Sequence, residues 1–236
     1  MEELKQYLSG VAIGVRFRNN YSIEDYLGSI ADVLLFSKNN GLLNYVTFPY
    51  QSKSIDSTQL SLHNKSTGDN LTINMNNIVL DLNFSEKIPK EKSSDVIDEY
   101  FKALTQKIYK IVNIQDIQRV GLVYKYIIND EPSVKSIKKY FSEMTFDDAS
   151  TVTLNFSKKI ILSDSKLKKD HNDYENVICT LSIAHDKKNE YFFQVDYQHI
   201  YDPRLDSVID IPYKDFVDKA AYYNTDTISK WIKKYE

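Results

Sequence analysis

The chain has 236 residues, of which 42% are hydrophobic and 27% charged, a composition typical of a folded globular protein with a sizeable core. Its 30 basic and 33 acidic residues give a net charge of −3. This balance argues against a protein that binds nucleic acid non-specifically, because such binding needs many cations. A local basic face is still compatible with this net charge.

The first predicted elements are a strand over about residues 10–18 and an amphipathic helix over residues 23–37. Ser22 stands at the expected N-cap, and Glu24 and Asp25 follow in the first turn, where acidic side chains favour the helix dipole. An Asn-Asn-Gly sequence then ends the helical pattern, as a residue in the left-handed conformation would.

Alternating, β-branched or aromatic residues predict three further strands, at 42–48, 55–63 and 71–84. The polar cluster of residues 64–70 predicts the turn of a hairpin between the last two strands. A helix over about residues 94–112, with a regular apolar stripe, is expected to close the first half of the chain.

The second half repeats this order of elements. A strand over about residues 118–128 precedes Pro132 and Ser133, after which apolar residues at helical spacing predict a helix as far as Met144. The closing helical region is expected to be broken by an Asn-Thr-Asp sequence at 224–226. The remaining predicted elements are strands at 150–162, 175–185 and 190–201, a turn at 186–189 and the closing helical region at about 213–235.

Both halves therefore predict the order β-α-β-β-β-α, with Gly14 of the first half aligned with Gly121 of the second. We expect an α+β fold of two similar β-α-β-β-β-α halves, with largely antiparallel sheets packed by long helices. The expected boundary divides the chain into residues 1–114 and 115–236, which could also form one compact unit. Convergence is the alternative to duplication, since β-α units are common.

Cysteine usage and the absence of apolar runs predict the compartment. Cys179 is the single cysteine, so no disulfide can form within the chain, as a reducing cytoplasm would permit. Its strand-like setting predicts a buried core residue. The N-terminal sequence does not resemble a secretory signal, and no apolar run approaches the ~20 residues that cross a bilayer. We expect a soluble cytoplasmic protein that does not associate with a membrane.

Motifs for catalysis or for metal binding do not stand out. The best local group of metal-ligand types is Asp196, His199 and Asp202, but alternation along a strand would turn His199 away from the other two. No nucleophile elbow and no glycine-rich phosphate loop is present. We therefore expect no cofactor, no metal and no catalytic residue, and a binding protein rather than an enzyme. The four scattered histidines are His63, His171, His185 and His199.

Nucleic-acid binding has slightly more support. Only four of the 30 basic residues are Arg, and three of them lie on or beside the two opening strands, which suggests a bidentate or structural demand. Arg18 aligns with Lys125 of the second half. The competing explanation is ordinary solvated charge, which also accounts for the lysines between 158 and 169. The candidate nucleic-acid-binding residues are Arg16, Arg18, Arg119 and Lys125.

The sequence RVGLVYKYIIND, which begins at Arg119, resembles a sporadically distributed prokaryotic family of uncharacterised proteins of about this length. In that family an Arg-x-Gly-Leu-Arg-Tyr-type strand opens the second half; Arg119, Gly121, Leu122 and Tyr124 match it, and Val123 replaces the second Arg. The family is linked to no assigned enzyme, and its patchy distribution implies mobile or defence-associated genes.

We therefore predict a non-catalytic binding or assembly component of a bacterial accessory or phage-defence system, whose partner is another protein or a second copy. One alternative is an RNA-binding or metal-independent RNA-processing protein, with His63, His185 or His199 as candidates, which would show salt-dependent binding of RNA. The other is a small-molecule sensor that holds an apolar ligand between sheet and helix, and whose ligand would raise the melting temperature.

Overall fold

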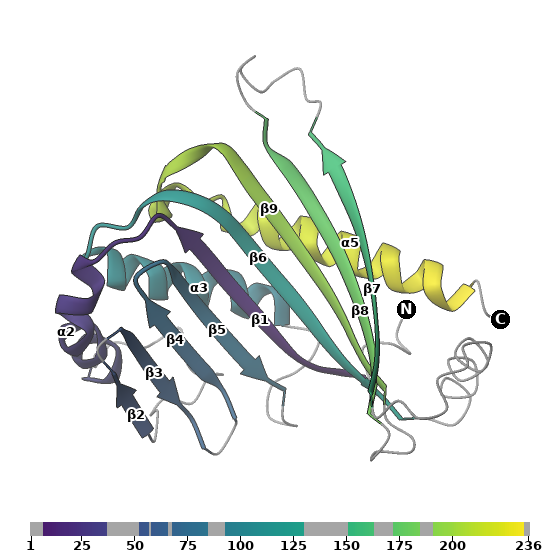
Figure 1. The fold of residues 1–236 in the computed structure, drawn as a ribbon, viewed down its shortest axis with the longest axis horizontal. Helices are drawn as coiled ribbons and strands as arrows, with labels where there is room; N and C mark the ends of the chain where they lie inside the picture. Colours follow the sequence, from purple (N-terminus) through teal and green to yellow (C-terminus); the bar gives the residue numbers. More distant parts are fainter. Residues whose placement is uncertain are drawn as a thin grey trace.

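A single antiparallel sheet of nine strands forms one layer of the protein (Figure 1). The computed structural model describes residues 7–36, 52–56, 58–65, 68–84, 93–129, 151–162, 172–184 and 191–233. In sheet order the strands are β2 (Ser52–Ile55), β3 (Gln59–His63), β4 (Asn70–Asn74), β5 (Asn77–Asn83), β1 (Leu8–Phe17), β6 (Gln115–Ile128), β9 (Tyr191–Ser207), β8 (Tyr174–Ala184) and β7 (Thr151–Ile161).

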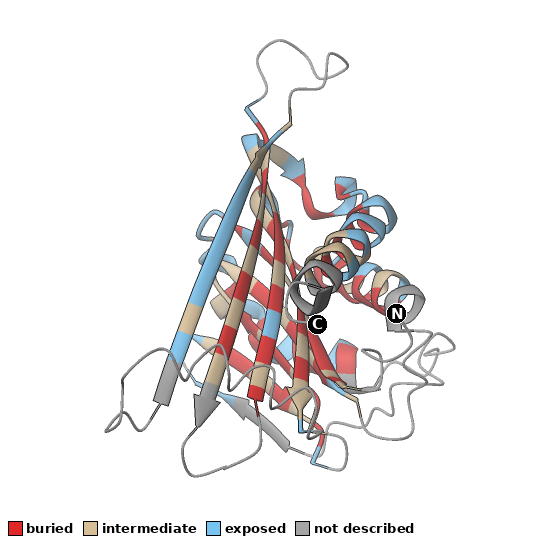
Figure 2. Ribbon diagram, turned by 90° about the vertical axis from the view of Figure 1, so that its right-hand side faces the viewer, coloured by how far each residue is buried: buried red, intermediate tan, exposed pale blue. Residues whose placement is uncertain are grey.

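The helices form the second layer, and Figures 1 and 2 show α3 and α5 on the same face of the sheet. Helix α2 packs against both α3 and β3. No helix in the described part of the chain covers the opposite face of the sheet. The helices are α2 (Ser22–Phe36), α3 (Ser93–Tyr109) and α5 (Tyr213–Lys233), and a short 3-10 helix, η3 (Val208–Asp210), precedes α5.

The predicted α+β fold of two similar β-α-β-β-β-α halves, with largely antiparallel sheets packed by long helices, is wrong, because the described strands form one large sheet. The opening strands β1 and β6 pair with each other, and Gly14 lies opposite Gly121, so one hydrogen-bonded ladder continues through the middle of the chain. The first half supplies five strands to this sheet and the second half four. The expected boundary between residues 114 and 115 falls just before β6 and stays a prediction.

Two predicted strands are hairpins instead. The segment 71–84 turns at Met75 and Asn76, because the Asn74 side chain accepts hydrogen bonds from the backbone N–H groups of Asn76 and Asn77 at 3.1 and 3.0 Å. The segment 55–63 turns at Asp56, whose carboxylate accepts from the N–H groups of Thr58 and Gln59 at 2.8 Å. Short polar side chains of this kind compete with the strand ladder for backbone donors.

The predicted turn at 64–70 is confirmed: β3 and β4 pair up to His63 and Asn70, and Asn64 donates its N–H to the Asp69 carbonyl at 2.9 Å. Gly68 lies in this turn with φ of 79°, a conformation that glycine adopts without the strain a side chain would bring. The predicted strand at 42–48, the helix from 134 to 144 and the turn at 186–189 lie outside the described residues.

The helix ends also differ from the expected ones. Asn20, not Ser22, caps α2, because its side-chain oxygen accepts the Ser22 N–H at 3.2 Å. Helix α5 continues through the predicted break at 224–226. The reason is that Asn224 is buried and donates to the Tyr126 hydroxyl at 2.6 Å, which anchors the middle of the helix to the sheet.

The core lies between the helices and the sheet, in a single cluster of buried side chains. Alternate residues of the strands point into it, as Val11, Ile13 and Val15 of β1 do, and the residues between them point to the uncovered face. Each helix contributes an apolar stripe, which is the amphipathic pattern that the sequence predicts. None of the described helices combines the length and the apolar character that crossing a bilayer requires.

Candidate functional site

Two of the predicted basic residues meet at the centre of the sheet. Arg16 of β1 and Arg119 of β6 lie directly opposite each other in the ladder, so their side chains leave the same face, the one that no described helix covers. Gln198 of β9 accepts a hydrogen bond from the Arg119 guanidinium at 3.4 Å, and Gln198 donates in turn to Asp196 at 2.5 Å. Within the described residues neither arginine forms an ion pair.

The other two predicted cations are paired. Lys125 lies farther along β6 on the same face, and its ammonium contacts the Asp81 carboxylate of β5 at 2.5 Å. Arg18 lies just beyond β1, where its guanidinium is 3.7 Å from the Asp116 carboxylate. The four candidates therefore do not form one basic patch, and their role in binding nucleic acid stays a prediction.

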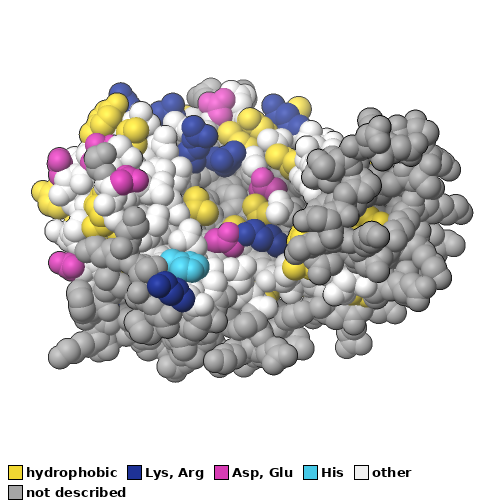
Figure 3. Space-filling model, turned by 60° about the horizontal axis from the view of Figure 1, so that its bottom comes forward, with side chains coloured by type: hydrophobic (Ala, Val, Ile, Leu, Met, Phe, Trp, Pro, Cys, Tyr) yellow, Lys and Arg dark blue, Asp and Glu magenta, His cyan; other side chains and the backbone are white. Residues whose placement is uncertain are grey.

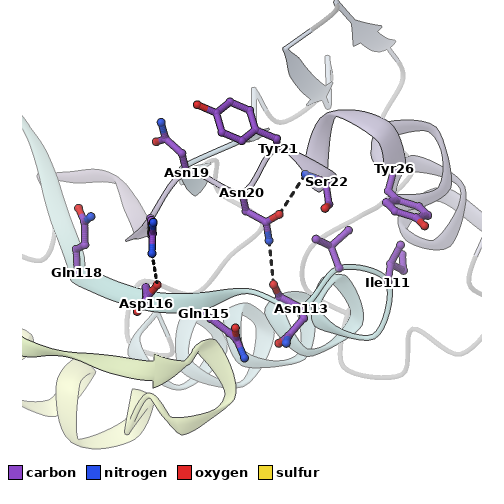
Figure 4. A pocket seen from close by; sticks show the side chains of 12 residues that line it. Asn19, Asn20, Tyr21, Ser22, Tyr26, Ile111, Asn113, Gln115, Asp116 and Gln118 are labelled. Atoms are coloured by element: carbon purple, nitrogen blue, oxygen red, sulfur yellow. Dashed lines mark hydrogen bonds and ion pairs between the residues drawn. The ribbon is translucent and has the colours of Figure 1, made fainter.

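A pocket opens beside Arg18, at the end of the sheet where β1 ends and β6 begins (Figure 4). Its volume is about 960 Å³, near the upper end of the range for sites that bind small molecules. One wall is the connection from β1 to α2, and the other is the connection from α3 to β6 (Figure 4). Its lining residues are Arg18, Asn19, Asn20, Tyr21, Ser22, Tyr26, Ile111, Val112, Asn113, Gln115, Asp116 and Gln118.

Local hydrogen bonds fix both walls of the pocket. The Asn20 side chain caps α2 and also donates to the Asn113 carbonyl at 2.9 Å, so one residue ties the two connections together (Figure 4). The N–H of Arg18 donates to the Asp116 carbonyl at 3.2 Å. Asp116 has a φ of 55°, and the β1–β6 register shifts beside it, which is the signature of a β-bulge.

The chemistry of the pocket is that of uncharged hydrogen-bonding groups. Five of the lining side chains are carboxamides, each of which offers a donor and an acceptor, and Tyr21 and Tyr26 are exposed on the α2 side. Among the described lining residues two side chains are charged, Arg18 and Asp116, and they are opposite in sign and close together. Such a lining suits a ligand with both donors and acceptors and a flat or apolar surface for the tyrosine rings.

A second polar cluster is buried under α5 and serves the fold. The Glu175 carboxylate of β8 is 1% exposed and contacts the Lys219 ammonium of α5 at 2.9 Å. His199 of β9 lies 3.8 Å from the same carboxylate and 3.3 Å from that of Asp173. Burial raises the pKa of Glu175, but the contacts with His199 and Lys219 outweigh it and lower the pKa to about 2. The Glu175 carboxylate is therefore charged, its charge is balanced by the Lys219 ammonium, and its burial keeps ligands from reaching it.

The histidines and the cysteine do not join a common site. His63 lies on the uncovered face of β3, whereas His199 faces α5, so the structure does not bring them together; His171 and His185 lie outside the described residues. Burial raises the pKa of the Cys179 thiol to about 11, so the reactive thiolate is scarce at neutral pH. Among the described residues no three His, Cys, Asp or Glu side chains are grouped to hold a metal ion.

Sequence reasoning missed the pocket because its residues carry no motif. Asn19-Asn20 and the run from Asn113 to Gln118 are far apart in the chain, and each reads as an ordinary polar connection. The available signal was the concentration of Asn and Gln at the ends of the two strands that proved to be neighbours. No protein-family model matches the chain and neither does any curated protein, so the resemblance drawn from residues 119–124 stays a prediction.

Proposed function

We propose that this chain is a non-catalytic binding protein, and that its pocket holds a polar ligand through the side chains of Asn and Gln. The observation that carries the proposal is the lining itself, in which five carboxamides and two exposed tyrosines surround a volume of about 960 Å³. Carboxamides titrate at no accessible pH and are poor nucleophiles, so they suit recognition better than acid–base or covalent chemistry.

A thermal-shift screen tests this proposal. The probes are uncharged polar compounds: nucleosides, monosaccharides, and amides of amino acids and dipeptides. A compound present at 100 times its Kd adds about 2.7 kcal/mol to the free energy of unfolding, which raises Tm by several degrees. We expect at least one class to stabilise the wild-type protein.

Two variants locate the binding. Gln115→Trp places a bulky ring in the pocket, and Gln194→Trp makes the same change at another exposed strand position, on the uncovered face of β9. The stabilisation should be lost in Gln115→Trp and kept in Gln194→Trp. If no compound stabilises the wild type more than it stabilises Gln115→Trp, the proposal is wrong.

Self-association is a second candidate function, and the edge strand β7 favours it. β7 has eleven residues, ends the sheet, and is largely exposed along its length (Figure 2). Phe156 at its midpoint is 43% exposed. Among the described strands none pairs with the outer edge of β7, and a second copy of β7 could pair antiparallel there, in a register centred on Phe156. That register places Lys158 opposite Leu154 and Lys159 opposite Thr153, so no two lysines face each other.

Light scattering after size-exclusion chromatography tests the second candidate. Phe156→Lys would put two like charges at the centre of the paired edges, and we expect it to convert a dimer to a monomer. Ile209→Lys is the matched control, because Ile209 is 45% exposed and lies on η3 rather than on the sheet edge. A wild-type protein that is monomeric at every concentration would remove this candidate.

The biological setting stays a prediction. Membership of a bacterial accessory or phage-defence system, a protein partner and a cytoplasmic location all come from the sequence and its resemblance, and the pocket does not bear on them.

A further inference from the structure

The two opposed arginines beside the pocket are an unusual feature of the sheet. Arg16 and Arg119 occupy a directly paired position on the uncovered face, where like charges destabilise the pairing of two strands. In the described part of the chain the Arg119 side chain forms one hydrogen bond, a long one of 3.4 Å to the neutral side chain of Gln198, and Arg16 forms none. An anion placed between the two guanidinium groups would remove their repulsion.

Lys125, on the same face of the sheet, contrasts with the two arginines because its charge is paired. Lys125 lies six residues beyond Arg119 on β6, and there the sheet provides a carboxylate, because Asp81 of β5 contacts the ammonium at 2.5 Å. The Lys125 cation is therefore already neutralised. Beside the arginines the Asp196 carboxylate of β9 accepts a hydrogen bond from Gln198, the residue that also accepts one from Arg119. Burial raises the pKa of Asp196, and the positive charge of Arg119 opposes this rise without overcoming it.

Beside the arginines this face of the sheet has a position without side chains. The next pair along the same face is Gly14 opposite Gly121, and glycines place no side chain above the sheet. A methyl group built on Gly121 would meet the Asp196 carboxylate oxygen at 3.8 Å, and one built on Gly14 would meet the Val79 side chain at 3.2 Å, so neighbouring side chains border this position on both sides. Figure 3 shows a hollow on this side of the molecule, with basic and acidic side chains around it.

The arginine pair also adjoins the pocket along the chain. Arg18, a lining residue, is two residues after Arg16, and Gln118, another lining residue, immediately precedes Arg119. At about 3.3 Å per residue along a strand, the backbone beside the arginines is within about 7 Å of the pocket wall. A ligand of moderate size can therefore contact both the carboxamides of the pocket and the guanidinium groups.

We propose that Arg16 and Arg119 bind the phosphate of a nucleoside phosphate whose base and sugar occupy the pocket. The inference rests on the proposed function and names its ligand class. Guanidinium groups match phosphate oxygens with two parallel hydrogen bonds, carboxamides read the donor and acceptor edge of a base, and the exposed tyrosines offer rings for stacking. The phosphate can belong to a free nucleotide or to the end of an oligonucleotide, since both present the same group.

Isothermal titration calorimetry tests the inference with four sets of probes: the four common ribonucleosides, their 5′-monophosphates, inorganic phosphate, and a 5′-phosphorylated trinucleotide. We expect at least one monophosphate to bind about tenfold or more tightly than its nucleoside, as charge-assisted hydrogen bonds predict. This advantage should shrink at high salt, which screens the arginines.

Single substitutions test whether the arginines cause the tighter binding of the monophosphate. Arg16→Gln and Arg119→Gln should each abolish the advantage of the monophosphate over the nucleoside and leave nucleoside binding unchanged. Lys125→Gln removes a cation from the same face and should leave the advantage intact, because Asp81 already neutralises that cation. Arg16→Lys keeps the charge but loses the planar fork, so it should retain only part of the advantage.

Each outcome has one meaning. Tighter binding of the trinucleotide than of the monophosphate identifies a nucleic-acid end as the source, and equal or weaker binding identifies a free nucleotide; both support the inference. Equal affinity for a nucleoside and its monophosphate overturns it while leaving the proposed pocket function intact. An advantage that persists in both arginine variants, or a failure of every probe to bind, also overturns it, and the wider compound screen then decides the proposed function separately.

Discussion

Lys219 of α5 donates a hydrogen bond to the buried carboxylate of Glu175 on β8, with 2.9 Å between nitrogen and oxygen. The lysine side chain is 51% exposed, whereas the carboxylate is 1% exposed. Water therefore reaches one partner of the pair and not the other. An unpaired charge at the position of Glu175 would be costly, so the contact fixes α5 over this part of the sheet.

The stability of the protein should fall with acid because of Glu175. Its pKa is lowered from 4.5 to about 2 in the folded protein, so its contribution is fully present above about pH 4.5 and is lost as pH falls towards 2. At about 1.4 kcal/mol per pKa unit, and with an allowance for the solvent around Lys219, this amounts to about 1–3 kcal/mol. Urea unfolding of the wild type and Glu175→Gln should give free energies that differ at pH 7 and converge near pH 2. Asp32→Asn, which removes an exposed carboxylate of α2, should show no such convergence.

The hydrogen bond between Asn224 and Tyr126 should be measurable as stability. Tyr126→Phe removes the acceptor and leaves the buried amide of Asn224 without this partner, which should cost about 1–3 kcal/mol of unfolding free energy in urea. Tyr222→Phe is the control, because Tyr222 is an exposed tyrosine of the same helix. Equal stability of the two variants would show that this hydrogen bond does not anchor α5.

Replacing glycine by alanine should have opposite effects on stability at Gly10 of β1 and at Gly121 of β6. A Cβ on Gly10 would lie 2.5 Å from the Leu82 carbonyl oxygen, whereas one on Gly121 meets nothing closer than 3.8 Å. Gly10→Ala should therefore destabilise by about 1–3 kcal/mol, because backbone must move. Gly121→Ala should stabilise by about 0.5–1 kcal/mol, because alanine loses less backbone entropy on folding. Thermal unfolding of both variants checks the pair, and a stabilised Gly10→Ala protein would contradict the close approach of β1 and β5.

The positive φ of Asp116 predicts an order among substitutions at the pocket wall. Asparagine tolerates this left-handed conformation about as well as aspartate, so Asp116→Asn should change stability by less than about 0.5 kcal/mol. Valine does not tolerate it, and Asp116→Val should cost about 1–3 kcal/mol. Urea unfolding of both variants is the measurement, and equal losses would mean that the ion pair with Arg18, rather than the backbone, makes the difference.

Much of the fold could be predicted because long periodic segments report their own secondary structure. The strands around Gly14 and Gly121 and the helix beginning near Ser22 lie where periodicity places them. Short polar side chains were harder to interpret: Asn74 and Asn224 look alike in the sequence, yet one ends a strand and the other sits inside a helix. The difference lies in the Tyr126 hydroxyl, which comes from a distant strand.

The order of the strands in the sheet and the position of the site could not be predicted from the sequence for the same reason, because both depend on contacts between distant segments. Pairing of β1 with β6 depends on which edges remain free after local hairpins form, and periodicity carries no information about that choice. The sequence marks Arg16 and Arg119 as unusual residues, but it does not show that they lie opposite each other in the sheet. The pocket required two polar connections to meet, and neither Asn20 nor Asn113 signals the other.

The pairing of β1 with β6 also determines how late in translation β1 can gain its second neighbouring strand. Gly14 meets Gly121, a residue made 107 positions later, and at typical ribosomal speeds the interval is on the order of 5 to 20 seconds. Throughout that time one side of β1 has no native neighbour, which leaves an open edge available to other emerging chains. Arrest of translation before β6 should therefore produce a polypeptide that aggregates, whereas arrest after residue 128 should hide that edge.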